Sequence, residues 1–171
     1  LLQGYPDYAR LQSELASLYH EQGNKDLAEE TYLKAIRLWE QLPGARVPWY
    51  PQTIMGLAKL YQEQDRLSES TALFLQSKQY WEKTLGNQYP LYIINILDLA
   101  RLSWETGHYS QADSLYGMAA DLGRERLIGA SQYMSARELN KYMQKIIDTQ
   151  AEILSFVNQS PIHSITAESC Y

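Results

Sequence analysis

The stretch PWYPQTIMGLAKLYQEQDRLSESTALFLQSKQYWEKTLGNQY, residues 48–89, decides the fold, because related residues recur 42 positions before it and 42 positions after it. The three units span residues 6–47, 48–89 and 90–128. The matched columns are Pro6, Pro48 and Pro90; Tyr8, Tyr50 and Tyr92; Leu15-Ala16, Leu57-Ala58 and Leu99-Ala100; Leu18, Leu60 and Leu102; Glu21, Glu63 and Glu105; and Tyr32, Phe74 and Tyr116. A period of this length is the signature of a supersecondary unit stacked several times.

Each unit is predicted to be two helices joined by a tight turn. The first helix of the first unit has an apolar stripe with the spacing of one helix face, which we expect to lie in the core: Leu11, Leu15, Leu18 and Tyr19. The turn is expected where glycine, or aspartate in the middle unit, tolerates a left-handed backbone: Gly23, Asp65 and Gly107.

The second helix of each unit is expected to begin at a side chain that can cap it. This column holds Asp26, Ser68 and Ser110, and Asp26 with Glu29 resembles a capping box. Small residues then recur where two antiparallel helices must approach closely: Ala28, Ser70 and Ala112, followed by Ala35, Ser77 and Ala119.

The sequence therefore predicts an all-α, right-handed superhelical solenoid of antiparallel hairpins, covering residues 1–128. Gly129-Ala130-Ser131 is expected to mark a break after the third unit. A long helix over about 135–157, within a segment 129–157, is expected to close the stack. Residues 158–171 lack periodicity and are interpreted as a linker or a disordered tail.

Composition argues against several classes of protein. The 15 basic and 20 acidic residues leave a formal charge of −5, which does not suit a nucleic-acid binder. Stretches without charge, such as residues 84–97, are too short to cross a membrane. The single cysteine, Cys170, fits a reducing compartment, so we expect a cytoplasmic protein. The chain opens without a methionine and is interpreted as a piece of a longer protein.

No catalytic constellation is visible in the sequence. The three histidines, His20, His108 and His163, are far apart, and none has a partner at metal-ligand spacing. Cys170 and His163 lie in the aperiodic tail, where no scaffold would orient a thiol nucleophile. We therefore expect no enzyme activity, no catalytic residue, no cofactor and no metal.

Two motifs resemble the tetratricopeptide repeat (TPR). One is Leu-Ala-x-x-Tyr, seen at Leu15, Ala16 and Tyr19, and the other is Ala-x-x-x-Tyr-x-x-Ala, which ends at Ala35. The 42-residue period is similar to that of the longer subtype found in kinesin light chains and in many bacterial proteins. This resemblance covers roughly residues 6–127 and implies a scaffold that binds a protein or peptide.

A second resemblance lies beyond the repeats. YMSAREL at residues 133–139 and ILSF at residues 153–156 look like the helix that follows the repeats in bacterial TPR-CHAT proteins. Those proteins join such repeats to a caspase-like protease domain, which would begin near residues 169–171. The resemblance implies a regulatory or sensor fragment of a bacterial CHAT protein.

In TPR arrays the first helices of the hairpins line a concave groove. Carried over by resemblance, the partner-binding positions are Arg10, Ser13, Ser17 and His20; Gln52, Met55, Lys59 and Gln62; and Ile94, Leu97, Arg101 and Trp104. Lys59 and Arg101 share a column and either bind an acidic group or are solvated charges.

The apolar groove positions Ile94, Leu97 and Trp104 either contact a partner or are covered by the helix after Ser135. The alternative function is architectural, with self-association through the open ends of the stack and no peptide ligand.

Overall fold

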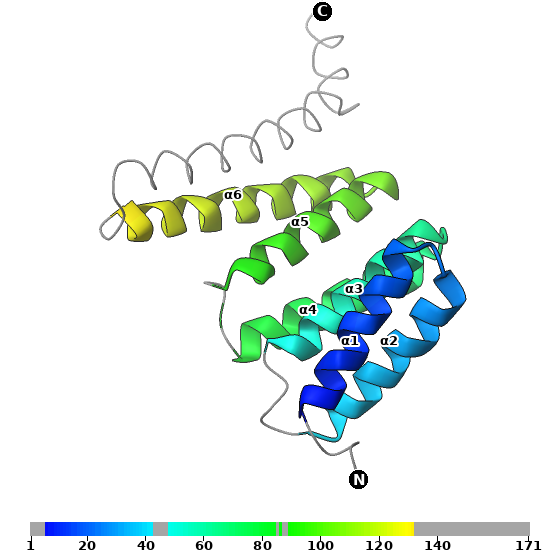
Figure 1. The fold of residues 1–171 in the computed structure, drawn as a ribbon. Helices are drawn as coiled ribbons and strands as arrows, with labels where there is room; N and C mark the ends of the chain where they lie inside the picture. The colour runs from blue at the N-terminus through cyan, green and yellow to red at the C-terminus, as the bar shows by residue number, and fades with distance from the viewer. Residues whose placement is uncertain (1–5, 43–47, 85, 87–88, 132–171) are drawn as a thin grey trace, which may run out of the picture.

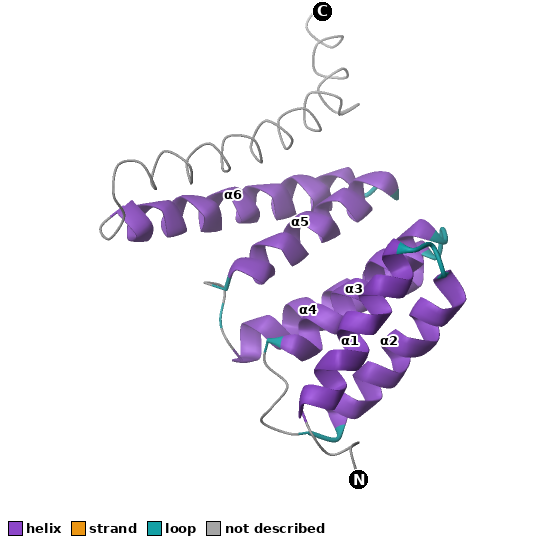
Figure 2. Ribbon diagram, in the orientation of Figure 1, coloured by secondary structure: helices purple, strands orange, loops and turns teal. Residues whose placement is uncertain are grey.

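The computed structural model describes residues 6–42, 48–84, 86 and 89–131. This part of the chain contains helices and no strand (Figure 2). The helices are α1 (Pro6–Glu21), α2 (Lys25–Glu40), α3 (Trp49–Glu63), α4 (Leu67–Thr84), α5 (Pro90–Glu105) and α6 (Tyr109–Ser131). They form three antiparallel hairpins, and α2 packs on α3 and α4 on α5 (Figure 1). The all-α solenoid expected from the 42-residue period is confirmed.

The turns inside the hairpins are as predicted. Gly23, Asp65 and Gly107 have φ angles of 76°, 61° and 79°, in the left-handed region. The amide that follows each of them donates to a carbonyl five residues back: Asn24 to Tyr19 at 2.9 Å, Arg66 to Tyr61 at 2.9 Å, and His108 to Ser103 at 2.7 Å. These bonds form Schellman motifs, which require a left-handed residue at this position.

The predicted helix caps are wrong by two positions. The second helices begin at Lys25, Leu67 and Tyr109, so Asp26, Ser68 and Ser110 lie within their first turns. The N-cap of α2 is Asn24, and its side chain makes no capping bond. The reason is that the Schellman turn leaves only one residue between the left-handed position and the next helix. Glu29 has no capping role and contacts the next hairpin instead.

Close contact within a hairpin depends on the small residues. In the middle unit Ser70 Oγ donates to the carbonyl of Ala58 at 2.8 Å, and Ser77 Oγ donates to that of Pro51 at 3.1 Å. Both hydroxyls are buried, so these bonds satisfy groups that would otherwise be costly to desolvate. A larger side chain at either position would push α4 away from α3.

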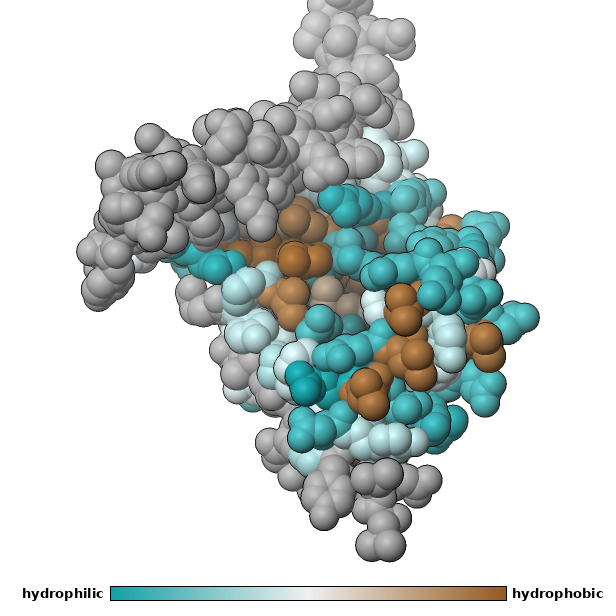
Figure 3. All heavy atoms as spheres, in the orientation of Figure 1, coloured by the Kyte–Doolittle hydropathy of each residue, from teal (hydrophilic) through white to brown (hydrophobic). Residues whose placement is uncertain are grey.

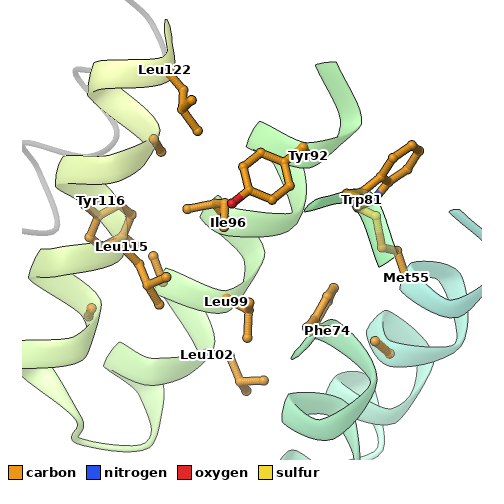
Figure 4. Packing of buried hydrophobic residues seen from close by; sticks show 14 residues of the cluster. Met55, Phe74, Trp81, Tyr92, Ile96, Leu99, Leu102, Leu115, Tyr116 and Leu122 are labelled. Atoms are coloured by element: carbon orange, nitrogen blue, oxygen red, sulfur yellow. The ribbon is translucent and has the colours of Figure 1, made fainter. Parts of the chain in front are cut away.

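The core runs between the hairpins as well as within them. Leu57 and Leu60 of α3 are buried in a cluster with Ala28 and Tyr32. Between the second and third hairpins, Phe74 of α4 points toward the residues of α5 that are equivalent to these leucines (Figure 4). The leucines buried there are Leu99 and Leu102.

The apolar stripe predicted for the first helix is only partly correct. Leu11 is 57% and Leu18 is 47% exposed, while Leu15 and Tyr19 are half-buried. The expectation failed for Leu11 and Leu18 because no hairpin in the described part of the chain lies against this side of α1. A stripe becomes core only when a neighbour covers it.

Gly129-Ala130-Ser131, predicted to mark a break after the third unit, are the last three residues of α6, which ends at Ser131. The closing helix expected over about 135–157 and the tail at 158–171 lie outside the described residues.

Candidate functional site

A hollow of about 330 Å³ lies on the surface formed by the first helices of the three hairpins. Residues of α1, α3 and α5 line it, together with one side chain from α2: Ser13, Glu14, Ser17, Tyr32, Trp49, Gln52, Thr53, Met55, Gly56, Lys59, Leu91 and Ile94. Apolar side chains lie there together with polar ones, which is the usual composition of a binding site.

Six of the predicted groove positions line this hollow: Ser13, Ser17, Gln52, Met55, Lys59 and Ile94. The others lie outside it: Arg10, His20, Gln62, Leu97, Arg101 and Trp104. Sequence reasoning missed the other six lining residues, of which Tyr32 alone comes from a second helix: Glu14, Tyr32, Trp49, Thr53, Gly56 and Leu91. The sequence does contain one signal for Gly56, because the equivalent positions of the other two units hold the charged residues Glu14 and Asp98.

Gly56 packs directly against the ring of Tyr32 from the first hairpin. A Cβ atom at position 56 would lie 2.7 Å from Cε1 and Oη of Tyr32, so the ring would have to shift if this position carried a side chain. The ring therefore crosses from the first hairpin to form part of the lining of the hollow. Burial raises the pKa of Tyr32, while a side-chain hydrogen bond with Ser17 acts in the opposite direction. The hydroxyl is thus neutral at physiological pH and can serve as a donor.

The two cations of the shared column both contact Asp98. Lys59 Nζ lies 3.0 Å from Asp98 Oδ2, and Arg101 Nη1 lies 3.4 Å from Asp98 Oδ1. The carboxylate is buried and the two cations are partly exposed. Lys59 and Arg101 thus pair with an acidic group of the chain itself, while their side chains remain 45% and 36% exposed. Lys59 also lines the hollow, so its ammonium group is a candidate contact for an anionic group.

Side chains along the same surface link one first helix to the next. The hydroxyls of Ser13 and Thr53 are 2.8 Å apart. His20 Nε2 lies 3.0 Å from Glu63 Oε1. Gln62 Nε2 donates to Glu105 Oε2 at 2.7 Å, one unit further along. His20 and Gln62 thus each contact a glutamate of the next hairpin.

The three apolar positions of α5 differ in exposure. Ile94 is 41% exposed, whereas Leu97 and Trp104 are partly buried against the core. The Trp104 ring also packs edge-on against Tyr109, with 4.9 Å between ring centroids. Ile94 is therefore the most accessible of the three. The helix after Ser135, which the sequence analysis considered as a cover for these three side chains, lies outside the described residues.

Arg10 lies beside the hollow at the α1 end. Its guanidinium carbon is 5.5 Å from the ring centroid of Trp49, and its nitrogens are 3.6 Å from Asp7 and 3.8 Å from Glu14. Arg10 thus helps to hold Trp49 and Glu14, which do line the hollow.

Two searches of the described residues gave negative results. No group of three or more His, Cys, Asp or Glu side chains within residues 6–42, 48–84, 86 and 89–131 is placed to hold a metal ion. None of the helices α1 to α6 is long and apolar enough to cross a membrane.

Comparison with known proteins agrees with this architecture. A family model described as the tetratricopeptide repeat matches residues 7–77 and again residues 50–125. No curated protein matches the sequence significantly.

Several solved structures share the fold. BtubC (BKLC) from P. vanneervenii superposes with a TM-score of 0.64 at 18% identity, covering 94% of this chain and 68% of that one. A variant of a putative kinesin light chain from Podosopora anserina, with nearly identical TPR-like repeats, gives 0.61 at 20% identity over 91% and 77% of the two chains. A second structure of the Podosopora anserina protein gives 0.56 at 18% identity over 97% and 98%. With the family model matching more than two-thirds of its length, this chain belongs to the tetratricopeptide repeat family, whose members are helical scaffolds that generally bind protein partners.

Proposed function

We propose that this protein is a scaffold that holds a peptide segment of a partner protein in the hollow across α1, α3 and α5. The observation that carries the proposal is the hollow itself, of about 330 Å³, with Tyr32, Met55 and Ile94 among its apolar lining. This volume is at the lower end of the range for ligand sites, so it suits one or two side chains of a longer segment.

The energetics favour an apolar anchor with an acidic neighbour. Covering the exposed part of Ile94 removes apolar surface from water, at roughly 25 cal/mol per Å². A carboxylate beside the anchor can approach Lys59, whose side chain is 45% exposed and whose ammonium group lies 3.0 Å from Asp98 Oδ2. The polar lining residues Gln52 and Ser17 can hydrogen-bond the remaining backbone of the peptide.

The test is selection of binding sequences from a displayed peptide library, followed by calorimetric titration of the selected peptides. Ile94→Ser is expected to weaken binding at least fivefold, since Ile94 is 41% exposed in the hollow. The matched control is Leu75→Ser, because Leu75 is 38% exposed but lies on α4, away from the lining of the hollow. Equal affinities for both variants would refute the placement of the peptide.

We also propose that the scaffold is the regulatory part of a larger bacterial cytoplasmic protein with a CHAT protease domain. Support comes from the 42-residue period and from the resemblance of residues 133–139 and 153–156 to the helix that follows the repeats in that family. The direct test is the sequence of the parent gene beyond Tyr171. A caspase-like histidine and cysteine pair is expected there, and a continuous open reading frame without one would refute this assignment.

The alternative function is architectural self-association through an open end of the stack. The exposure of Leu11 and Leu18 on α1 is the observation that favours it. Sedimentation equilibrium over a hundredfold concentration range distinguishes the two functions. A single monomeric mass, together with peptide binding, supports the scaffold function.

A further inference from the structure

The two inner first helices dock on the preceding hairpin through one set of positions. Each presents a pair of buried leucines, Leu57 and Leu60 on α3 and Leu99 and Leu102 on α5. Each also presents an N-terminal tyrosine that donates to a glutamate of the preceding second helix. Tyr50 Oη lies 3.2 Å from Glu40 Oε1, and Tyr92 Oη lies 2.7 Å from Glu82 Oε1.

The α3 helix adds a second tyrosine at its other end. Tyr61 Oη donates to Glu29 Oε1 at 2.9 Å, and Arg66 contacts the same carboxylate at 2.9 Å while lying 3.6 Å from the centroid of the Tyr61 ring. Burial, followed by the hydrogen bond to Glu29, raises the pKa of Tyr61, so its hydroxyl stays a donor.

The spacing of the two tyrosines on α3 matches the spacing of the two glutamates on α2. Tyr50 and Tyr61 are eleven positions apart on α3, and Glu29 and Glu40 are eleven positions apart on α2. Eleven residues make about three helical turns, or roughly 16 Å, so both pairs lie along one helix face. Because the helices are antiparallel, the first tyrosine meets the second glutamate and the second tyrosine meets the first.

The outward face of α1 carries the same set as α3. Tyr8 and Tyr19 occupy the columns of Tyr50 and Tyr61, again eleven positions apart, and Leu15 and Leu18 occupy the columns of the buried leucines. Leu11 makes this face more apolar than its counterparts, because the same column holds Thr53 and Asn95. Figure 3 shows hydrophobic side chains gathered along this face of α1.

A terminal repeat that faces water needs a polar outer face, whereas α1 has the face of an internal repeat. We propose that this face of α1 docks the second helix of a further hairpin of the same repeat type. The partner helix has the chemistry of α2, with an apolar stripe and two glutamates eleven positions apart. The inference rests on the inter-hairpin contacts and is independent of the hollow and its ligand.

The same comparison argues against a second copy of this chain stacked head to tail. Its free second helix would be α6, where the columns of Glu29 and Glu40 hold Asp113 and Arg124. An arginine cannot accept a hydrogen bond from a tyrosine hydroxyl. The α6 helix therefore offers only one of the two acceptors that α1 requires.

The experiment adds the proposed partner to the intact chain. Residues 1–47 are placed before residues 6–171, so that the added α2 can lie on the native α1. Hydrogen exchange of the native α1 amides is expected to slow at least about tenfold relative to the parent chain, because its outer face is now covered. Unchanged exchange in α1 would overturn the proposal.

Variants identify the contacts that cause the protection. Tyr8→Phe and Tyr19→Phe in the native α1 are expected to reduce the protection gained in the extended protein, with no effect in the parent chain. Leu18→Glu is expected to abolish the gain. Leu27→Glu is the matched control, because Leu27 is 48% exposed on α2 and shares its column with Glu69 and Gln111.

Two results would contradict the assignment of the occupant. Equal effects of Leu18→Glu and Leu27→Glu would show that the face does not dock a helix in this register. Self-association of the parent chain that Leu18→Glu abolishes would show that a second copy occupies the face.

Discussion

At the scale of single residues, the absence of a Cβ atom at position 56 leaves room for the ring of Tyr32 beside the hollow. The same column holds Glu14 and Asp98 in the other two units. Glycine in a helix interior costs roughly 1 kcal/mol relative to alanine. Its presence at position 56 has a steric reason, whereas Gly117 and Gly123 of α6 have no heavy atom within 4 Å of an added Cβ.

We therefore predict opposite effects for one substitution at two sites. Gly117→Ala should raise the free energy of unfolding by about 0.5–1 kcal/mol through helix propensity. Gly56→Ala should lower it by about 1 kcal/mol, because overpacking against Tyr32 costs roughly 1–3 kcal/mol and outweighs the same gain. Urea unfolding followed by circular dichroism measures both. A stabilising Gly56→Ala would mean that the Tyr32 ring moves aside freely.

Asn95 shows how one column changes its chemistry between repeats. In the middle unit Thr53 Oγ1 donates to the carbonyl of Trp49 at 2.8 Å and also contacts Ser13. One period later Asn95 replaces the threonine and Met55 stands in the column of the serine. Asn95 is fully buried, and neither its amide nitrogen nor its oxygen has a hydrogen-bond partner within the described part of the chain.

Asn95→Thr is therefore expected to stabilise the protein by about 1–2 kcal/mol. A threonine hydroxyl can donate to the carbonyl of Leu91, four residues back, as Thr53 does to Trp49, and a buried unsatisfied amide costs roughly 1–3 kcal/mol. The reciprocal variant Thr53→Asn should be destabilising. Both are measured by denaturant midpoints with a constant m-value, and a loss of stability in Asn95→Thr would show that position 95 does not follow the geometry of position 53.

At the scale of the elements, the sequence predicted the hairpins and their turns but not the caps. The turns were predictable because a left-handed residue is a local requirement, which Gly23 and Gly107 meet by themselves. The start of α2 was not, because Asp26 is a good capping residue locally and the Schellman turn still places the helix start before it. The partner of Glu29 lies 37 positions away at Arg66, beyond the reach of any local pattern.

Asp65 is the one turn residue that is not glycine, and it gives a prediction at this scale. Its φ of 61° strains a side-chain-bearing residue, although less for aspartate than for most others. Asp65→Gly should therefore stabilise the protein by up to about 1 kcal/mol, and Gly23→Ala should destabilise it by about the same amount. Thermal unfolding of the two variants checks the signs. Equal shifts in one direction would contradict the dependence on backbone conformation.

At the scale of the whole molecule, a repeat sequence does not reveal which of its faces are covered. Leu18, Leu60 and Leu102 occupy equivalent positions in the three units, yet Leu60 and Leu102 are buried and Leu18 is not. The residues of the binding surface could likewise be predicted only in part from the repeat. The columns gave Met55, Lys59 and Ile94, but Tyr32 reaches the hollow only because two hairpins stack, and Asp98 meets Lys59 across the next junction.

The stability cost of the same substitution at equivalent positions then shows whether a further hairpin covers α1. Leu60→Ala should lower the free energy of unfolding by about 2–5 kcal/mol, because it leaves a cavity between α2 and α3. Leu18→Ala, the same change at the same column, should cost less than about 1 kcal/mol while the outer face of α1 is uncovered. If a further hairpin is stacked on α1, the cost at Leu18 should rise toward that at Leu60, since in a solenoid each interface adds its own contribution. Urea unfolding of both variants, in the parent chain and in the extended one, gives the comparison. Equal costs in the parent chain would mean that α1 is already covered.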